Sequence, residues 1–335
     1  MANKPGMTQI IRAKNSWFQA VFRISQLVTF HSYTIFLFTY SDFKTIVAPS
    51  TIFGVINSLA TGAYALDHDD VPIDLSLLAC RLFRTLLWVS LVFIPFAINN
   101  QRSPSAIAED SINKPWRPLP QKRLSPYQAQ CIMYFFAALV QIHGYVHKGV
   151  GYRQSSVLLG LDIWYNNYGG ADKSPVIRNL INAFGYLCFI SGALEVALGQ
   201  RLAFSLSSVF QAGPENYLSQ WLLIIWGIIF TTVHLQDLYD QEGDAARGRR
   251  TMPLVVGDGA ARWTITVCML IWGVVCPLFW GLRDAILAFS ISLACIVALR
   301  VLVVRHEEAD RMTFRIWNCW ISAVYVMPVV AQMEF

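Results

Sequence analysis

Hydrophobic stretches long enough to cross a bilayer recur along most of the chain. A transmembrane helix needs about 20 mostly apolar residues, and polar segments separate one such stretch from the next. The stretch at 151–167 is weaker because it carries Asp162 and other polar residues, but we interpret it as a span. The pattern predicts nine membrane-spanning helices, near 45–65, 77–99, 127–146, 151–167, 179–199, 218–236, 262–281, 285–304 and 314–333.

The distribution of basic residues orients these spans. If the first span begins near residue 45, most of the 26 lysine and arginine residues fall on one side of the membrane, and few fall on the other. Lysine and arginine concentrate on the cytosolic side of membrane proteins, so we expect the basic side to be cytosolic. This side holds the N-terminal segment and the loops at 100–126, 168–178, 237–261 and 305–313.

Residues 24–41 are also apolar, but polar side chains interrupt them. A crossing here would move the basic N-terminus to the wrong side, so we expect a helix lying along the membrane interface. The chain is therefore predicted to have two parts. Residues 1–44 form a basic N-terminal segment with the interfacial helix, and residues 45–335 form the transmembrane catalytic domain.

Composition agrees with a membrane protein. Hydrophobic residues make up 55% of the chain and charged residues only 14%, whereas soluble domains carry about 25% charged residues. This balance excludes a disordered chain and an ordinary soluble enzyme. We expect an all-α, polytopic membrane helix bundle that has the lipid bilayer as its environment. No nucleic-acid or protein partner is predicted.

Three aspartates mark the second long polar loop. Asp237, Asp240 and Asp244 are spaced i, i+3 and i+7, which places them on one face of a continuous helix. Three carboxylates held together repel one another, and a hard divalent cation such as Mg²⁺ offsets that cost. We therefore assign all three as catalytic metal ligands. A basic run that suits a polyanionic ligand follows at once: Arg247, Arg249 and Arg250.

The first long polar loop carries a related set. Asp110, Asn113 and Arg117 share the same spacing, although Pro115 limits the length of a helix there. We expect Glu109 to join Asp110 as a catalytic metal ligand. The predicted diphosphate-binding residues of this loop are Asn100, Asn113, Lys114 and Arg117.

Four predicted crossings separate the two loops. An even number of crossings returns the chain to the same side of the membrane, so both loops can lie over one cavity. The sequence thus predicts one site for a Mg²⁺-bound diphosphate on a lipid-soluble chain. This parity depends on 151–167 being a true span.

Both loops resemble a known family. The segments INKPWRPLP in the first loop and DLYDQEGDAARGRRTMPLVVG in the second are similar to the two signature regions of the UbiA superfamily of intramembrane prenyltransferases. The resemblance extends from about residue 45 to the end of the chain. It implies an all-helical bundle of about nine spans around a central cavity, where two aspartate-rich motifs bind Mg²⁺ and an isoprenyl diphosphate.

The first motif departs from the prenyltransferase pattern. Those enzymes typically carry an Asn-Asp pair and two further aspartates before Asn-Lys-Pro, but Ala106 and Ser103 stand at two of those aspartate positions here. This altered form resembles the fungal membrane-bound terpene cyclases of the same superfamily. The resemblance implies a class I sesquiterpene cyclase of secondary metabolism acting on farnesyl diphosphate, in the endoplasmic reticulum with its mouth facing the cytosol.

Two other interpretations stay open. A prenyltransferase would use the same ionisation but pass the isoprenyl group to an aromatic acceptor. A transporter or membrane scaffold would explain buried polar residues, but not two carboxylate clusters with lysine and arginine on one face. The residues also leave open which aromatic side chains line the cavity, from a set that comprises Tyr134, Phe135, Phe136, Trp164, Tyr165, Trp221, Trp226, Trp272, Trp317, Trp320 and Tyr325.

Overall fold

The computed structural model describes residues 7–66, 74–204 and 207–334, and these ranges contain helices and no strands. The predicted all-α class is therefore confirmed. The helices are α1 (Met7–Thr39), η1 (Tyr40–Asp42), η2 (Phe43–Val47), α2 (Ala48–Asn57), α3 (Leu75–Arg102), α4 (Pro104–Asn113), α5 (Pro126–Val146), α6 (Tyr152–Asn167), α7 (Pro175–Leu198), η3 (Ser207–Phe210), η4 (Pro214–Asn216), α8 (Tyr217–Thr232), η5 (Val233–Leu238), α9 (Gln241–Arg247), α10 (Met252–Val256), α11 (Asp258–Phe279), α12 (Asp284–Val303) and α13 (Glu307–Glu334).

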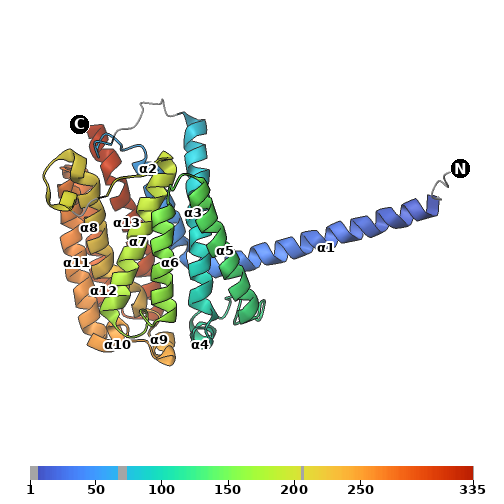
Figure 1. Cartoon of the computed structure of the whole chain (residues 1–335). Coiled ribbons are helices and arrows are strands. Elements are labelled where there is room, and N and C mark those ends of the chain that lie inside the picture. The colour runs from blue at the N-terminus through green and yellow to red at the C-terminus, as the bar shows by residue number, and fades with distance from the viewer. Residues whose placement is uncertain (1–6, 67–73, 205–206, 335) are drawn as a thin grey trace.

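Long helices stand side by side as a bundle (Figure 1). Within the described residues, seven helical stretches are long and apolar enough to cross a membrane. Each coincides with one of the nine predicted spans. They are Leu75–Arg102, Pro126–Val146, Pro175–Leu198, Pro214–Leu238, Asp258–Phe279, Asp284–Val303 and Glu307–Glu334.

The other two predicted spans are shorter helices of the same bundle. At about 1.5 Å per residue, the 16 residues of α6 extend less than the ~30 Å of a hydrocarbon core. In place of the span at 45–65, the chain forms the π-helical turn η2, the 10-residue α2 and a set of turns. Even so, α6 carries the chain from one end of the bundle to the other (Figure 1), so the predicted parity of the two polar loops holds.

Close packing holds α2 in the bundle. It contacts α7, α13 and α3, and Gly54 lies so near α7 that a Cβ atom there would sit 2.6 Å from the backbone of Ala193. Only a glycine allows this approach. The contact matters for the site, because η1 and η2, directly before α2, bring Asp42 and Thr45 to the central cavity.

Helix α1 leaves the bundle at a steep angle (Figure 1). The end of α1 nearest the bundle contacts α3 and η1. Large apolar side chains such as Trp17, Phe18 and Phe22 are exposed along it. The helix is longer than the predicted 24–41, because it begins at Met7. Its exposed apolar side chains suit a helix in the membrane interface, and both that role and the division of the chain at residue 44 stay predictions.

Candidate active site

The two polar loops meet at one end of the bundle. Helices α4 and α9 lie beside each other there (Figure 1). The Nζ atom of Lys114 is 3.2 Å from a carboxylate oxygen of Asp240, and a guanidinium nitrogen of Arg249 is 2.7 Å from a carboxylate oxygen of Glu109. Ion pairs therefore join two segments that are more than a hundred residues apart in the chain.

Neither loop is one continuous helix, so the expected helical face of three aspartates is wrong in detail. Asp237 lies in the 3₁₀-helix η5, Asp240 lies between helices, and Asp244 lies in α9. A 3₁₀ turn advances with three residues per turn, which changes the directions of side chains relative to an α-helix. In the first loop, α4 ends at Asn113 just before Pro115, as the proline predicts.

Asp237 is held by a buried arginine from α7. The guanidinium of Arg178 donates a 2.8 Å hydrogen bond to Asp237 and another of 2.7 Å to the hydroxyl of Tyr165 on α6. Both Asp237 and Arg178 are buried. A buried charge is tolerated when it is paired and hydrogen-bonded, so this contact fixes both side chains.

Asp110 is held in the same way from within its own loop. Arg117 donates a 2.7 Å hydrogen bond to Asp110 and lies 3.6 Å from Asp42, a residue of η1. Both Asp110 and Arg117 are buried. The N-terminal segment therefore adds the acidic side chain of Asp42 to those of the two loops.

Arg249 joins the two loops most extensively. It contacts Glu109 at 2.7 Å, Asp244 at 3.0 Å and Asp172, from the turn between α6 and α7, at 3.1 Å. Its neighbour Arg247 contacts the second oxygen of Glu109 at 3.0 Å. Both oxygens of Glu109 are thus bound to arginines. Its predicted role as a metal ligand competes with these two partners.

Four cations and four aspartates form pairs around the mouth of the cavity. In each pair the cation lines the cavity, and one carboxylate oxygen contacts it. The second carboxylate oxygen of every one of these aspartates is buried and has no hydrogen-bond partner. The pairs are Lys114 with Asp240, Arg117 with Asp110, Arg178 with Asp237, and Arg249 with Asp244.

These unpartnered oxygens suit a hard cation. Buried polar atoms without a partner are rare and call for an explanation, and Mg²⁺ prefers carboxylate oxygens, water and phosphate oxygens. The described residues hold no ready-made group of three His, Cys, Asp or Glu side chains at metal-binding distances. The donor set therefore fits Mg²⁺ in kind, and the aspartates would hold it together with phosphate oxygens and water.

Burial and charge act against each other on these carboxyl groups. Burial raises the pKa of Glu109, but the positive charges of Arg249 and Arg247 outweigh it and lower the pKa below its usual value. Burial raises the pKa of Asp110 despite the charge of Arg117. Burial also raises the pKa of Asp244 to about 6, although Arg178 acts the other way. A cation bound nearby would favour the charged form of these carboxyl groups and so oppose the effect of burial on their pKa.

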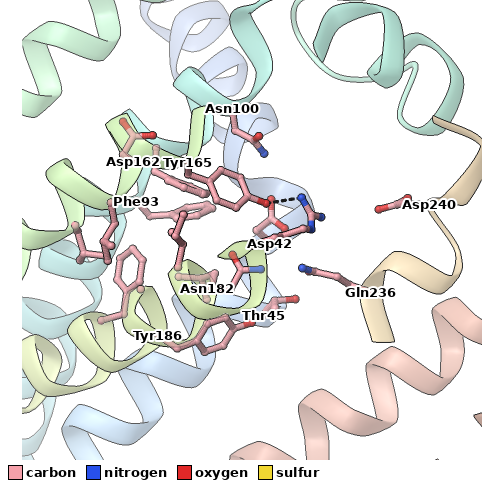
Figure 2. A pocket seen from close by; sticks show the side chains of 18 of the residues that line it. Asp42, Thr45, Phe93, Asn100, Asp162, Tyr165, Asn182, Tyr186, Gln236 and Asp240 are labelled. Atoms are coloured by element: carbon pink, nitrogen blue, oxygen red, sulfur yellow. Dashed lines mark hydrogen bonds between the residues drawn. The ribbon is translucent and has the colours of Figure 1, made fainter. Parts of the chain in front are cut away.

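The cavity behind these pairs has a volume of about 120 Å³. Figure 2 shows Phe93, Tyr186, Tyr165 and Asp162 on one side of it and Asp240 across from them. The wall is polar near the two loops and largely apolar and aromatic between α3, α6 and α7. Its apolar lining comprises Ile46, Phe93, Phe96, Leu158, Leu161, Tyr165, Ile181, Tyr186 and Phe189.

Three of the predicted diphosphate-binding residues do not line the cavity: Asn113, Arg247 and Arg250. Asn100 lines the cavity and lies 3.5 Å from Arg249, whereas Asn113 donates its side-chain hydrogen bond to the backbone of Asp240 at 3.3 Å. Arg250 is exposed and does not line the cavity. Of the eleven candidate aromatic residues, Tyr165 lines the cavity.

Sequence reasoning missed several residues that reach the cavity. Arg178 was counted as the last residue of the loop at 168–178, one position before the predicted span at 179–199, so it gave no sign of being a buried residue of the site. Asp162 is an ionisable residue inside the predicted span at 151–167, which is a signal of function, but we interpreted it only as weakening that span. Asp42 lines the cavity, and Asp172 pairs with Arg247 and Arg249 beside it. Both lie in segments that were expected to be interfacial or plain loop, so no local pattern marked them.

Known proteins with similar sequences include terpene cyclases and prenyltransferases. The chain is 26% identical to the fumagillin β-trans-bergamotene synthase of Aspergillus fumigatus over 90% of this chain and 93% of that protein. It is 28% identical to a polyprenyl transferase of Hericium erinaceus over 70% of this chain and 72% of the relative. A diterpene cyclase of the same fungus is also 28% identical, over 69% and 66%.

Solved structures share the fold. A UbiA homologue from Archaeoglobus fulgidus bound to DMAPP and Mg²⁺ aligns with a TM-score of 0.54 and 14% identity, over 85% of this chain and 98% of that one. An apo UbiA homologue from Aeropyrum pernix aligns with a TM-score of 0.59 and 14% identity, over 84% and 98%. The profile of the UbiA prenyltransferase family matches residues 60–320, which is most of the chain. This protein therefore belongs to the UbiA prenyltransferase family.

Proposed function

We propose that the protein is a membrane-bound class I terpene cyclase that converts farnesyl diphosphate into a sesquiterpene with the help of Mg²⁺. The observation that carries this proposal is the set of four cation–aspartate pairs whose cations line one aromatic-walled cavity. The similarity to the bergamotene synthase over 90% of the chain supports the cyclase and names β-trans-bergamotene as the first product to test.

Charged residues at the mouth promote the ionisation of the substrate. Bound Mg²⁺ would neutralise the negative charge that develops on the diphosphate as the C–O bond breaks. Asp110, Asp237, Asp240 and Asp244 would hold the metal through their unpartnered oxygens, together with phosphate oxygens and water. The cavity-facing cations Lys114, Arg117, Arg178 and Arg249 bind the phosphate oxygens. Donors fixed in advance where charge develops are the strongest source of rate enhancement.

The deeper wall protects and guides the carbocation. Apolar side chains from α3, α6 and α7 exclude water, which would otherwise capture the cation as an alcohol. The aromatic faces of Phe93, Phe96 and Phe189 attract a positive charge, each by roughly 0.5–2 kcal/mol. The contour of this wall then decides how the chain folds before the rings close.

A prenyltransferase is the second candidate, and the similarity to a polyprenyl transferase favours it. It would share the ionisation but pass the cation to an aromatic acceptor. For either candidate we propose the endoplasmic reticulum membrane as the location, with the mouth on the cytosolic side because basic loops favour that side.

Product analysis separates the two candidates. Microsomes that contain the protein are incubated with C10, C15 and C20 diphosphates and Mg²⁺, and extracts are analysed by gas chromatography and mass spectrometry. A cyclic C15 hydrocarbon formed without an acceptor is expected. Products that appear only after a phenol is added would support the prenyltransferase, and no metal-dependent turnover of any diphosphate would overturn both.

A further inference from the structure

We call the cavity of the candidate active site the reaction cavity. A second cavity adjoins it at the same end of the bundle. It has a volume of about 570 Å³, and η1, η2 and the first turns of α13 contribute to its wall. Asp42, Thr45 and Lys114 line both cavities, so the two spaces share one wall. We call the second space the basic vestibule, because Lys44, Lys114, Arg311 and Arg315 all line it.

The positive charge of the basic vestibule is only partly compensated. Lys114 is paired with Asp240, and Arg311 is paired with Glu307 at 2.7 Å. Lys44 and Arg315 make no ion pair or hydrogen bond within the part of the chain that the structure describes. The charges that act on Lys44 are those of Arg315, Asp42, Arg311 and Lys114, which means three cations and one acid.

Hydroxyl groups in the same wall also lack partners. The Oγ atom of Ser41 and the Oγ1 atom of Thr45 are buried and make no hydrogen bond, and Thr45 is only 4% exposed. An unsatisfied buried hydroxyl costs free energy unless a ligand or water completes it. One concavity thus holds the unpaired cations Lys44 and Arg315 and two free hydroxyl groups. All four can donate hydrogen bonds to phosphate oxygens.

From this arrangement we propose that the basic vestibule is a second anion site, which binds a phosphate or diphosphate group beside the reaction cavity through Lys44, Arg315, Ser41 and Thr45. The group has two possible sources. One is the diphosphate that leaves the reaction cavity across the shared wall, an assignment that rests on the proposed function. The other is the phosphate of a membrane lipid headgroup, which would bind whatever the reaction is.

Binding of inorganic pyrophosphate tests the site directly. The full-length protein in detergent is equilibrated with radiolabelled pyrophosphate in the presence of EDTA, so that no divalent metal takes part. The double variant Lys44→Gln/Arg315→Gln is expected to bind at least tenfold more weakly than the unmodified protein, because two charge-assisted contacts are lost. Both side chains are exposed, so the variant should fold, and an unchanged elution volume and circular dichroism spectrum confirm it.

A matched control is Arg305→Gln. Arg305 is also exposed near the start of α13 but lies outside the basic vestibule, so this variant should bind pyrophosphate as the unmodified protein does. Equal binding by the double variant and the unmodified protein would overturn the proposal. Equal losses in the double variant and in Arg305→Gln would do the same, since they would indicate a general effect of surface charge.

Competition then separates the two sources. If the site serves membrane lipid, short-chain phosphatidic acid displaces the pyrophosphate; if it serves the leaving group, pyrophosphate stays bound. For the leaving group, the double variant should also be less sensitive to inhibition by added pyrophosphate during turnover. Because the binding assay contains neither metal nor isoprenoid, failure of the proposed cyclase function would leave its result intact.

Discussion

Asp110, Asp237, Asp240 and Asp244 each use one carboxylate oxygen within the protein and keep the other without a partner. The internal partner is a lysine or arginine that fixes the direction of the carboxylate. Of the four aspartates, Asp240 lines the cavity itself, and the other three lie directly behind cations that line it. A purely structural ion pair would satisfy both oxygens where it could, as Glu109 does with two arginines.

Asp237 gives the most direct test at this scale. Asp237→Asn keeps the shape of the side chain but removes the charge, so we expect turnover of the isoprenyl diphosphate to fall by at least about 100-fold. The protein should remain folded in the membrane. Asp258→Asn is the control, since Asp258 is a half-exposed carboxylate at the same end that pairs with Arg262 at 2.8 Å. Full activity of Asp237→Asn would remove the metal role of Asp237.

Asp162 should affect the product more than the ionisation. It is buried, lines the cavity and accepts hydrogen bonds from Asn99 at 3.0 Å and Asn166 at 2.6 Å. A fixed negative charge in a dry cavity favours carbocations that place their charge near it. We expect Asp162→Asn to change the ratio of terpene products while pyrophosphate release changes less than about tenfold. An unchanged product ratio would contradict this role.

Local sequence patterns could predict the polar residues of the two loops but not their partners. Aspartate spacing and the neighbouring arginines are visible within about twenty residues of sequence. Arg178 and Asp42 come from other helices, and their contacts with Asp237 and Arg117 form only when those helices pack. These contacts between different elements were therefore beyond local sequence patterns.

At the scale of elements, the site depends on the short helices α2 and α6, whose apolar sequences predict ordinary membrane spans. Helices α2 and α6 were predicted from their apolar stretches, but their lengths depend on where the chain turns within the bundle. The break between η5 and α9 at Asp240 likewise follows from tertiary packing. Hydropathy recovers the existence and order of the helices, because burial in lipid is a property of whole stretches.

Gly54 tests how far the cavity depends on α2. Gly54→Ala would bring a methyl group to 2.6 Å from the backbone of Ala193, so α2 must move away from α7. We expect a loss of about 1–3 kcal/mol in stability and a fall in activity, because α2 follows the residues that line the cavity. Thermal unfolding in detergent measures the first effect.

Gly160→Ala is the matched control on α6. A Cβ atom at Gly160 meets nothing within 4 Å, and alanine favours a helix more than glycine does. This variant should be at least as stable as the unmodified protein. Equal destabilisation of both variants would show that the effect is not specific to the contact between α2 and α7.

At the scale of the whole molecule, α4 and α9 lie at the same end of the bundle (Figure 1), and charged residues of their loops line the cavity there. The basic loops predict that this end faces the cytosol. In sealed microsomes, Ser105→Cys on α4 should react with an impermeant maleimide beyond the background of the native cysteines. Lys148→Cys, beyond the opposite end of α5, should react only after permeabilisation. Both positions are exposed, and the reverse pattern would contradict the orientation.

The paired state of the mouth has a consequence for selectivity. An arriving anion finds no vacant arginine, because Arg117, Arg178 and Arg249 already hold carboxylates. The anion must displace the aspartates from these arginines, and the displaced aspartates then need another positive charge beside them. A diphosphate with a bound divalent cation meets both needs, because its negative charges pair with the arginines and its cation pairs with the aspartates. A single phosphate without a cation does not. Farnesyl monophosphate should therefore be a much weaker competitor than the diphosphate, and added Mg²⁺ should widen the gap between their inhibition constants.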